Sequence, residues 1–219
     1  MGDLPGQGQT SRAQKGQIDD FNTYHENILE WIKIANEYKI PTFVLGVGLG
    51  GLIILNLLEK TELPIEGILL FSPMLELKRD YKGRKNKLIS NVGKISKDTR
   101  FKVGITPQDL TRNDEIIEET ANDGLMLKKV TYSWYNLINE KMKETMDHIR
   151  DIKPISALIM YGTKDKILET QSINEMKDKL KSKEMYFKVW DGLYHEIHNE
   201  PERDLVMRYV LSFLNNSVN

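Results

Sequence analysis

Two residues near the carboxyl end of the chain could hold and transfer a proton. Asp165 lies in YGTKDKIL (161–168), just after an apolar run, and His195 lies in WDGLYHEIHNEPER (190–203), after the next such run. A histidine can take a proton from a nucleophile, and an acid can hold the imidazole in the required tautomer. Each residue also has an ordinary interpretation, Asp165 as a turn former and His195 as a loop histidine bonded to the backbone.

A glycine-rich turn lies between two apolar runs in the stretch IPTFVLGVGLGGLIILNLLEK (40–60). The order strand, tight turn, helix suits two kinds of site. One is the dinucleotide fingerprint G-x-G-x-x-G, which also needs an acid at the end of the next strand to hold a ribose. Glu66 precedes that strand and Glu76 follows it, so the acid is missing although the glycines are present at Gly46, Gly48 and Gly51.

The other kind of site is the nucleophile elbow G-x-S-x-G, in which a strained turn exposes the attacking side chain. Gly46 and Gly50 occupy its two glycine positions, and Gly51 lets the following helix pack closely. The middle position is Gly48, which has no side chain that could attack an ester.

The bulk composition is that of a globular protein. The chain has 219 residues, of which 40% are hydrophobic and 29% charged, and its net charge is -1. These values fit one domain with a sizeable core and no general affinity for polyanions. With no cysteine, the chain has no disulfide, thiol nucleophile or thiolate metal site. No apolar run has membrane-spanning length and the first 17 residues contain no apolar signal core, so a cytoplasmic protein is expected.

Apolar patterns predict alternating strands and helices, which favours a parallel α/β sheet. The strands are expected at residues 42–45, 66–73, 154–162 and 184–192, and the helices at 19–38, 52–60, 170–180 and 202–214. The core face of the last helix is expected to hold Leu205, Val206, Tyr209, Val210, Phe213 and Leu214.

The alternation stops between Pro73 and Pro154, where the chain is polar and helical in pattern. This stretch predicts an insertion carried on the sheet. Its start is basic, with ten Lys or Arg against two Asp at residues 78–102. Such a segment is either a solvated face or a surface that attracts anionic lipid headgroups. It shows no pattern of base recognition, so no nucleic-acid partner is predicted.

The motifs together resemble one known family. The chain resembles the bacterial lysophospholipase and monoacylglycerol lipase group of α/β-hydrolases, of the serine aminopeptidase S33 type. The resemblance spans the whole chain in family order and rests, besides the glycine turn, on GDLPGQGQTSR (2–12), LTRNDEIIEE (110–119), SWYNLI (133–138), GTKD (162–165) and GLYHEIHNEPER (192–203).

The resemblance implies an α/β-hydrolase fold and a serine hydrolase that acts on a small-molecule acyl ester or lysolipid, with no cofactor. It makes Gly48 the nucleophile position, Asp165 the orienting acid and His195 the base, and the N–H of Leu49 an oxyanion donor. A helical cap at about residues 74–150 would shape the acyl pocket. Trp134, Tyr135 and Leu137 could form its wall, although their helical spacing also suits plain core.

The elbow departs from the family pattern Gly-His-Ser-Met-Gly-Gly. Here it is Gly-Val-Gly-Leu-Gly-Gly (46–51), so the serine and both its neighbours have changed. Loss of a triad serine costs about 10⁶ in turnover in a well-studied protease. Ser72 is the nearest substitute by position and Ser11 lies in the early loop, and both have ordinary turn or loop interpretations. A water bound to His195 could attack, but without an acyl-enzyme intermediate to divide the barrier.

The sequence also starts late relative to the family, because MGDLPGQG corresponds to the end of the fourth strand. The three preceding strands and the loop that supplies the second oxyanion donor have no counterpart. We therefore expect residues 1–3 to lack a partner strand and residues 42–45 to form a bare apolar edge, which invites association. We expect one of three outcomes: the chain is a fragment, a partner completes its fold, or it associates with itself through this edge.

The sequence thus predicts one truncated α/β-hydrolase domain over residues 1–219, related to lipid-ester hydrolases and largely inactive. The alternatives are a non-catalytic lipid or acyl binder and a dinucleotide-binding oxidoreductase. No metal site is predicted, since His195 and His198 with Glu196 between them lie in a loop. His198, His25 and His148 are expected at the surface.

Overall fold

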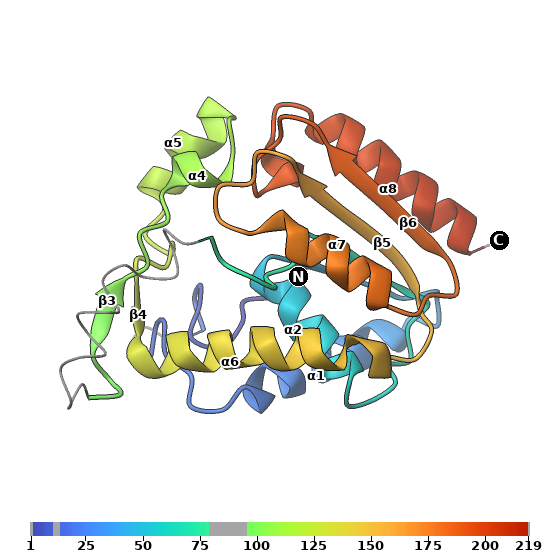
Figure 1. Ribbon diagram of the computed structural model, residues 1–219, viewed down its shortest axis with the longest axis horizontal. Coiled ribbons are helices and arrows are strands. Elements are labelled where there is room, and N and C mark those ends of the chain that lie inside the picture. Colours follow the sequence, from blue (N-terminus) through green and yellow to red (C-terminus); the bar gives the residue numbers. More distant parts are fainter. Residues whose placement is uncertain (1, 11–13, 79–95, 219) are drawn as a thin grey trace.

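A computed structural model describes residues 2–10, 14–78 and 96–218 (Figure 1). Its centre is a sheet of four parallel strands in the order β1-β2-β5-β6. The strands β2 and β5 are nearly uninterrupted apolar runs and are buried along almost their whole length, as expected when helices cover both faces of a parallel sheet. The bounds are β1 (Phe43–Val47), β2 (Gly67–Phe71), β5 (Ser156–Gly162) and β6 (Met185–Trp190).

Alternate residues of the strands feed two separate apolar clusters, one on each face of the sheet. On one face, Ile68, Leu70 and Ile159 join the core formed with four helices. On the other face, Leu69, Phe71 and Leu158 pack against α8 (Arg203–Ser217) and the short helix η2 (Ile197–Asn199). The four helices of the first face are α1 (Asn22–Asn36), α2 (Leu49–Leu58), α6 (Tyr132–His148) and α7 (Thr170–Lys179).

The chain between β2 and β5 holds further elements. We call it the β2–β5 connection (residues 72–155). The predicted cap boundary at about residues 74–150 falls inside it and stays a prediction. The predicted basic patch at residues 78–102 lies mostly at 79–95, outside the described residues. The elements are β3 (Arg100–Lys102), α4 (Pro107–Leu110), α5 (Asp114–Asn122), β4 (Lys129–Thr131), α6 and the short helix η1 (Ile149–Asp151). Figure 1 shows β3, β4, α4 and α5 to the left of the sheet, whereas α6 runs below it.

Two expectations about the burial of helical residues were wrong. Leu205 is not on the core face of α8, because 49% of it is exposed while Val206, Val210 and Phe213 are buried. His25 is not at the surface either. It is only 5% exposed, because α1 packs its side chain toward α2 and α6.

His25 belongs to a buried polar cluster between α1, α2 and α6. Asn56 is fully buried and its Nδ2 lies 3.0 Å from Thr145 Oγ1 and 3.1 Å from Glu59 Oε2. Burial, together with the nearby Lys60 and Lys141, lowers the pKa of His25 to about 4. Burial raises the pKa of Glu59 to about 7. At neutral pH His25 is therefore neutral, and Glu59 holds a proton part of the time.

The raised pKa of Glu59 predicts a pH-dependent stability effect. Glu59 costs the folded state nothing below its ordinary pKa of 4.5, and the cost grows as the pH rises to about 7. Replacing Glu59 by glutamine should therefore raise the melting temperature at pH 8 by ~4–8 °C, equivalent to about 2 kcal/mol, and leave it unchanged at pH 4. Thermal unfolding followed by circular dichroism at both pH values measures this.

Glu62→Gln is the matched control, because the Glu62 side chain is 65% exposed and pairs with the exposed Lys153. This control should change the melting temperature little at either pH. Equal shifts of the Glu59 variant at pH 4 and pH 8 would refute the assignment.

Candidate active site

Asp165 and His195 meet at the carboxyl edge of the sheet. Asp165 follows β5 and His195 follows β6, and these neighbouring strands are parallel, so both loops lie at the same edge. The His195 Nδ1 atom lies 2.8 Å from Asp165 Oδ2. Asp165 is fully buried and His195 is 6% exposed. The structure thus pairs the predicted acid and base.

The environment of Asp165 keeps its carboxyl group ionised. Burial raises the pKa of Asp165, but the hydrogen bond from His195 and the N–H groups of Leu168 and Ile167 lower it more, so the net pKa falls below 3.8. Those two N–H groups donate to Oδ1 over 3.0 and 2.8 Å. An ionised carboxylate only accepts, so Nδ1 of His195 carries the hydrogen and Nε2 is left as the acceptor.

The glycine turn has the shape of a strained elbow. Gly48 lies between β1 and α2 with φ 52° and ψ -114°, in a region that favours glycine. Its N–H donates to Phe71 O over 3.0 Å, and its carbonyl accepts from Met74 N over 2.9 Å. The end of β2 therefore holds the turn in place. Leu49 is the first residue of α2, and the N–H groups of a first helical turn have no partner within the helix.

Two neighbouring glycines are sterically required and a third is not. A Cβ at Gly46 would lie 2.6 Å from the backbone of Gly50, and one at Gly51 would lie 2.8 Å from Pro73 Cβ. A Cβ at Gly50 would meet nothing within 4 Å. Gly50 occupies a glycine position of the elbow pattern, but packing in the described chain does not require a glycine there, since it lines an open groove.

The third predicted position completes the arrangement. A Cβ built on Gly48 would lie 3.1 Å from His195 Nε2, so the free acceptor of the imidazole points at the place where a nucleophile would be attached. The structure thus brings together Gly48 at the predicted nucleophile position, His195 as the predicted base and Asp165 as the predicted acid. Gly48 has no side chain to face that acceptor.

Comparison with known proteins identifies the family. The family model described as serine aminopeptidase, S33, matches residues 1–202. The chain belongs to this family. It is also 32% identical over 214 residues to phospholipase YtpA of Bacillus subtilis, and the match covers 97% of this chain and 82% of the phospholipase. The predicted resemblance to lipase-like α/β-hydrolases is confirmed.

Solved structures of related enzymes confirm the α/β-hydrolase fold. The monoacylglycerol lipase of Paleococcus ferrophilus matches 97% of this chain and 81% of its own, with a TM-score of 0.83 and 21% identity. A soluble variant of the Saccharomyces cerevisiae monoglyceride lipase, in complex with a substrate analogue, matches 99% of this chain and 76% of its own, with a TM-score of 0.85 and 20% identity. In the part of the S33 chain that the structure describes, no helix is long and apolar enough to cross a membrane.

Ser72, one of the two substitute nucleophiles considered, supports the histidine loop of this S33 member. Its hydroxyl donates to the backbone carbonyl of His195 over 2.8 Å, and the residue is fully buried. Its φ of 42° is unusual for a residue other than glycine. Its N–H donates to Met160 O over 2.8 Å. Ser72 therefore joins the ends of β2 and β5 to the loop that carries His195. The other substitute, Ser11, lies outside the described residues.

A buried carboxylate that sequence reasoning missed anchors the same loop. Glu200 is fully buried, and its two oxygens accept from Tyr194 N over 2.7 Å and from Arg112 Nε over 2.9 Å. Thr111 Oγ1 donates to Asn199 O over 2.9 Å. The histidine loop is therefore tied to the β2–β5 connection.

Close backbone packing fixes the loop from the other side. A Cβ at Gly162, the last residue of β5, would lie 2.2 Å from Leu193 O. Only a glycine lets the histidine loop lie directly on the end of the strand that precedes Asp165. This glycine belongs to the GTKD motif, but its steric role could not be inferred without the loop that packs on it.

The remaining predicted residues take other roles. His198 is half-buried beside Phe71, and burial lowers its pKa, so the expectation of a surface histidine was wrong. Trp134 is in the core and donates to Tyr24 Oη over 3.0 Å, and Tyr135 packs edge-on against Phe101. Within residues 2–10, 14–78 and 96–218, no group of three or more potential ligands could hold a metal ion.

Proposed function

We propose that this chain is a lipid-ester hydrolase relative that cannot form an acyl-enzyme and is therefore largely inactive. One observation carries the proposal: Gly48 places only a hydrogen where the elbow faces His195 Nε2, at a Cβ distance of 3.1 Å. Ser72, the substitute in the described chain, uses its hydroxyl to support the His195 carbonyl.

The residues that are present suit only part of the reaction. Asp165 holds His195 with Nε2 as the acceptor, so a water molecule above Gly48 could be deprotonated there. The N–H of Leu49 could donate to the oxyanion. Water attack, however, must cross the whole barrier in one step, because no covalent intermediate divides it. Turnover should lie about 10⁶-fold below that of a serine enzyme.

The substrate class comes from the relatives. Phospholipase YtpA and monoacylglycerol lipases are named for lipid esters. The class that we propose is therefore a monoacylglycerol or lysophospholipid ester. A second function, retention of such an ester without hydrolysis, is favoured by the intact Asp165–His195 pair in an elbow that keeps its strained shape.

A fluorophosphonate probe and a p-nitrophenyl butyrate assay test the loss of the nucleophile. We expect no covalent labelling of the chain and hydrolysis about 10⁶-fold below that of the Bacillus phospholipase, assayed as the active reference. Labelling of any serine, located by mass spectrometry, would contradict the proposal, and so would turnover well above this residual level that His195→Ala removes. A Ser72→Ala chain shows whether Ser72 is the labelled residue.

Binding experiments separate the remaining alternatives. An ester binder should retain lysophosphatidylcholine in equilibrium dialysis and release it unhydrolysed. A dinucleotide enzyme should show a higher melting temperature with NAD(H) or NADP(H), and we expect no shift. Anionic vesicles test the contact predicted for the basic segment at residues 78–102, which neutral vesicles should not reproduce.

A further inference from the structure

Gly48 leaves an open space in front of His195. Among the described residues, and apart from the neighbours of Gly48 in the chain, only two atoms lie within 4 Å of a Cβ built there. They are His195 Nε2 at 3.1 Å and His195 Cε1 at 3.7 Å. A small molecule can therefore place a heavy atom at this point, within hydrogen-bonding distance of Nε2.

This space has the size of a small alcohol. A serine side chain adds one carbon and one oxygen to a glycine, and these are the heavy atoms of methanol. Gly48 and His195 are both buried, so the surrounding chain limits the size of a molecule that can enter. Methanol thus matches a serine side chain atom for atom, whereas a branched alcohol exceeds it.

The imidazole is prepared to take a proton from a hydroxyl group in this space. The His195 Nδ1 atom lies 2.8 Å from Asp165 Oδ2, which leaves Nε2 as the acceptor. A hydroxyl group that donates to Nε2 becomes a stronger nucleophile as its proton is transferred. The space at Gly48 therefore offers both the room and the base that an attacking alcohol needs.

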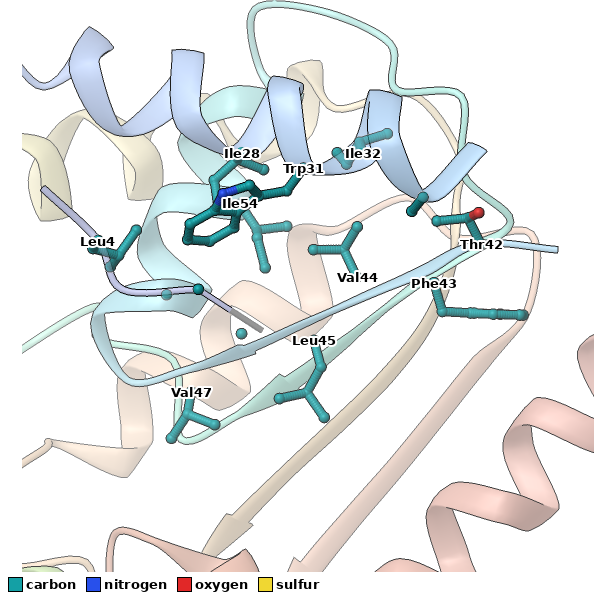
Figure 2. Close-up of a pocket in the computed structure, with 14 residues that line it drawn as sticks. Leu4, Ile28, Trp31, Ile32, Thr42, Phe43, Val44, Leu45, Val47 and Ile54 are labelled. Carbon is teal, nitrogen blue, oxygen red and sulfur yellow. The ribbon is translucent and has the colours of Figure 1, made fainter. Parts of the chain in front are cut away.

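The apolar groove along β1 is a different space. Figure 2 shows Trp31 and Val44 on one side of β1 and Leu45 on the other. Gly50 lines this groove but Gly48 does not, and the lining residues include no imidazole and no carboxylate. The two glycines of the elbow thus open onto different surroundings, and a base faces only the space at Gly48.

We propose that this chain transfers the acyl group of its ester directly to a small primary alcohol bound in the space at Gly48. The incoming hydroxyl gives its proton to His195 Nε2 while its oxygen bonds to the carbonyl carbon, and the N–H of Leu49 donates to the oxyanion. The original ester C–O bond then breaks, and the imidazolium returns the proton to the departing alkoxide. The products are a new ester and the original alcohol, and nothing is oxidised or reduced. The inference rests on the proposed function, because it requires that no serine takes the acyl group first.

The test uses p-nitrophenyl butyrate and deuterated methanol, with methyl butyrate and butyrate quantified by mass spectrometry. The same mixture without protein gives the intrinsic ratio of the two products. The part of the reaction that depends on the chain should show a ratio about fourfold higher, since burying one methyl-sized group is worth about that factor in affinity. Ester formation should fall from methanol to ethanol and be absent with tert-butanol. A ratio equal to that without protein, or no methyl ester that depends on the chain, would overturn the proposal.

Substitutions locate the bound alcohol. Gly48→Ala places a methyl group in the space, and His195→Ala removes the base, so neither variant should form methyl ester above the reaction without protein. Gly104→Ala is the matched control, because Gly104 also has a positive φ, 85°, and a Cβ there would meet nothing within 4 Å. It lies in the β2–β5 connection and should keep the raised ratio. Methyl ester that persists in Gly48→Ala would overturn the proposal, and the alcohol series in the unchanged chain decides if that variant does not fold.

Fluorophosphonate labelling separates failure of this inference from failure of the proposed function. An unlabelled chain with an unchanged product ratio contradicts the alcohol site alone and leaves the loss of the nucleophile standing. A labelled serine contradicts the proposed function and this inference together, because both products would then come from an acyl-enzyme.

Discussion

Replacing Gly48 by serine is expected to raise p-nitrophenyl ester hydrolysis about 10³-fold. A triad serine is worth about 10⁶ in turnover, and a missing oxyanion donor costs about 10²–10³. Leu49 N–H is the one donor that we assign, so the gain should be smaller than the full value. The hydroxyl would be one bond beyond a Cβ that lies 3.1 Å from His195 Nε2, so the imidazole must move by a few tenths of an ångström.

The same substitution should destabilise the fold. Gly48 has φ 52°, and a residue with a Cβ in such a conformation costs about 1–3 kcal/mol. Gly48→Ala is the matched control, because it adds the same Cβ and the same strain without the hydroxyl. It should lower the melting temperature equally and give no gain in hydrolysis. His195→Ala in the serine variant should remove the gain.

One result would contradict the elbow assignment. If the serine and alanine variants are both folded and hydrolyse the ester equally slowly, residue 48 is not the nucleophile position.

Removing the carboxylate of Glu200 should have the largest effect on stability. Glu200→Ala should lower the free energy of unfolding by about 3 kcal/mol, the lower end for breaking a buried ion pair. The lower end applies because Arg112 is 34% exposed and keeps its bond to Glu202. The N–H of Tyr194, by contrast, would lose its acceptor inside the protein. Urea unfolding measures the loss as a shift of the midpoint at constant slope.

Two neighbouring changes calibrate this prediction. Glu202 is the other partner of Arg112, and the Glu202 side chain is 38% exposed. Glu202→Ala should therefore lower the free energy of unfolding by less than about 1 kcal/mol. Glu200→Gln keeps the size of the side chain, so its loss in free energy of unfolding should lie between those of Glu200→Ala and Glu202→Ala. Faster hydrogen exchange in residues 193–199 of the Glu200 variants would localise the damage to the histidine loop. Equal losses for Ala at 200 and 202 would contradict the anchoring role.

The sequence predicted the parts of the site that depend on local pattern. The strands ending at Gly162 and Trp190 are apolar runs, and parallel strands bring the residues that follow them to one edge of the sheet. Asp165 and His195 therefore meet where strand order alone would place them. The elbow was predicted from its glycine pattern, although a Cβ at Gly50 would meet nothing within 4 Å.

The supporting residues could not be predicted because their roles depend on distant parts of the chain. Glu200 pairs with Arg112, 88 positions away, and Ser72 bonds the carbonyl of His195, 123 positions away. A lone glutamate or serine in a loop carries no sign of such a partner. His25 was misplaced for the same reason, since only the packing of α1 onto α2 and α6 buries it. Its helical spacing with Phe21 and Ile28 was the one available signal.

The elbow keeps its conformation with a glycine at its apex because the end of β2 and the close contacts of Gly46 and Gly51 hold it. Shape and reactivity are thus separable at this point of the molecule. In evolution, a glycine there would relieve conformational strain, and a lineage no longer selected for turnover would keep it as a gain in stability. A return from glycine to serine at residue 48 would need only one base change, if the glycine codon is GGT or GGC.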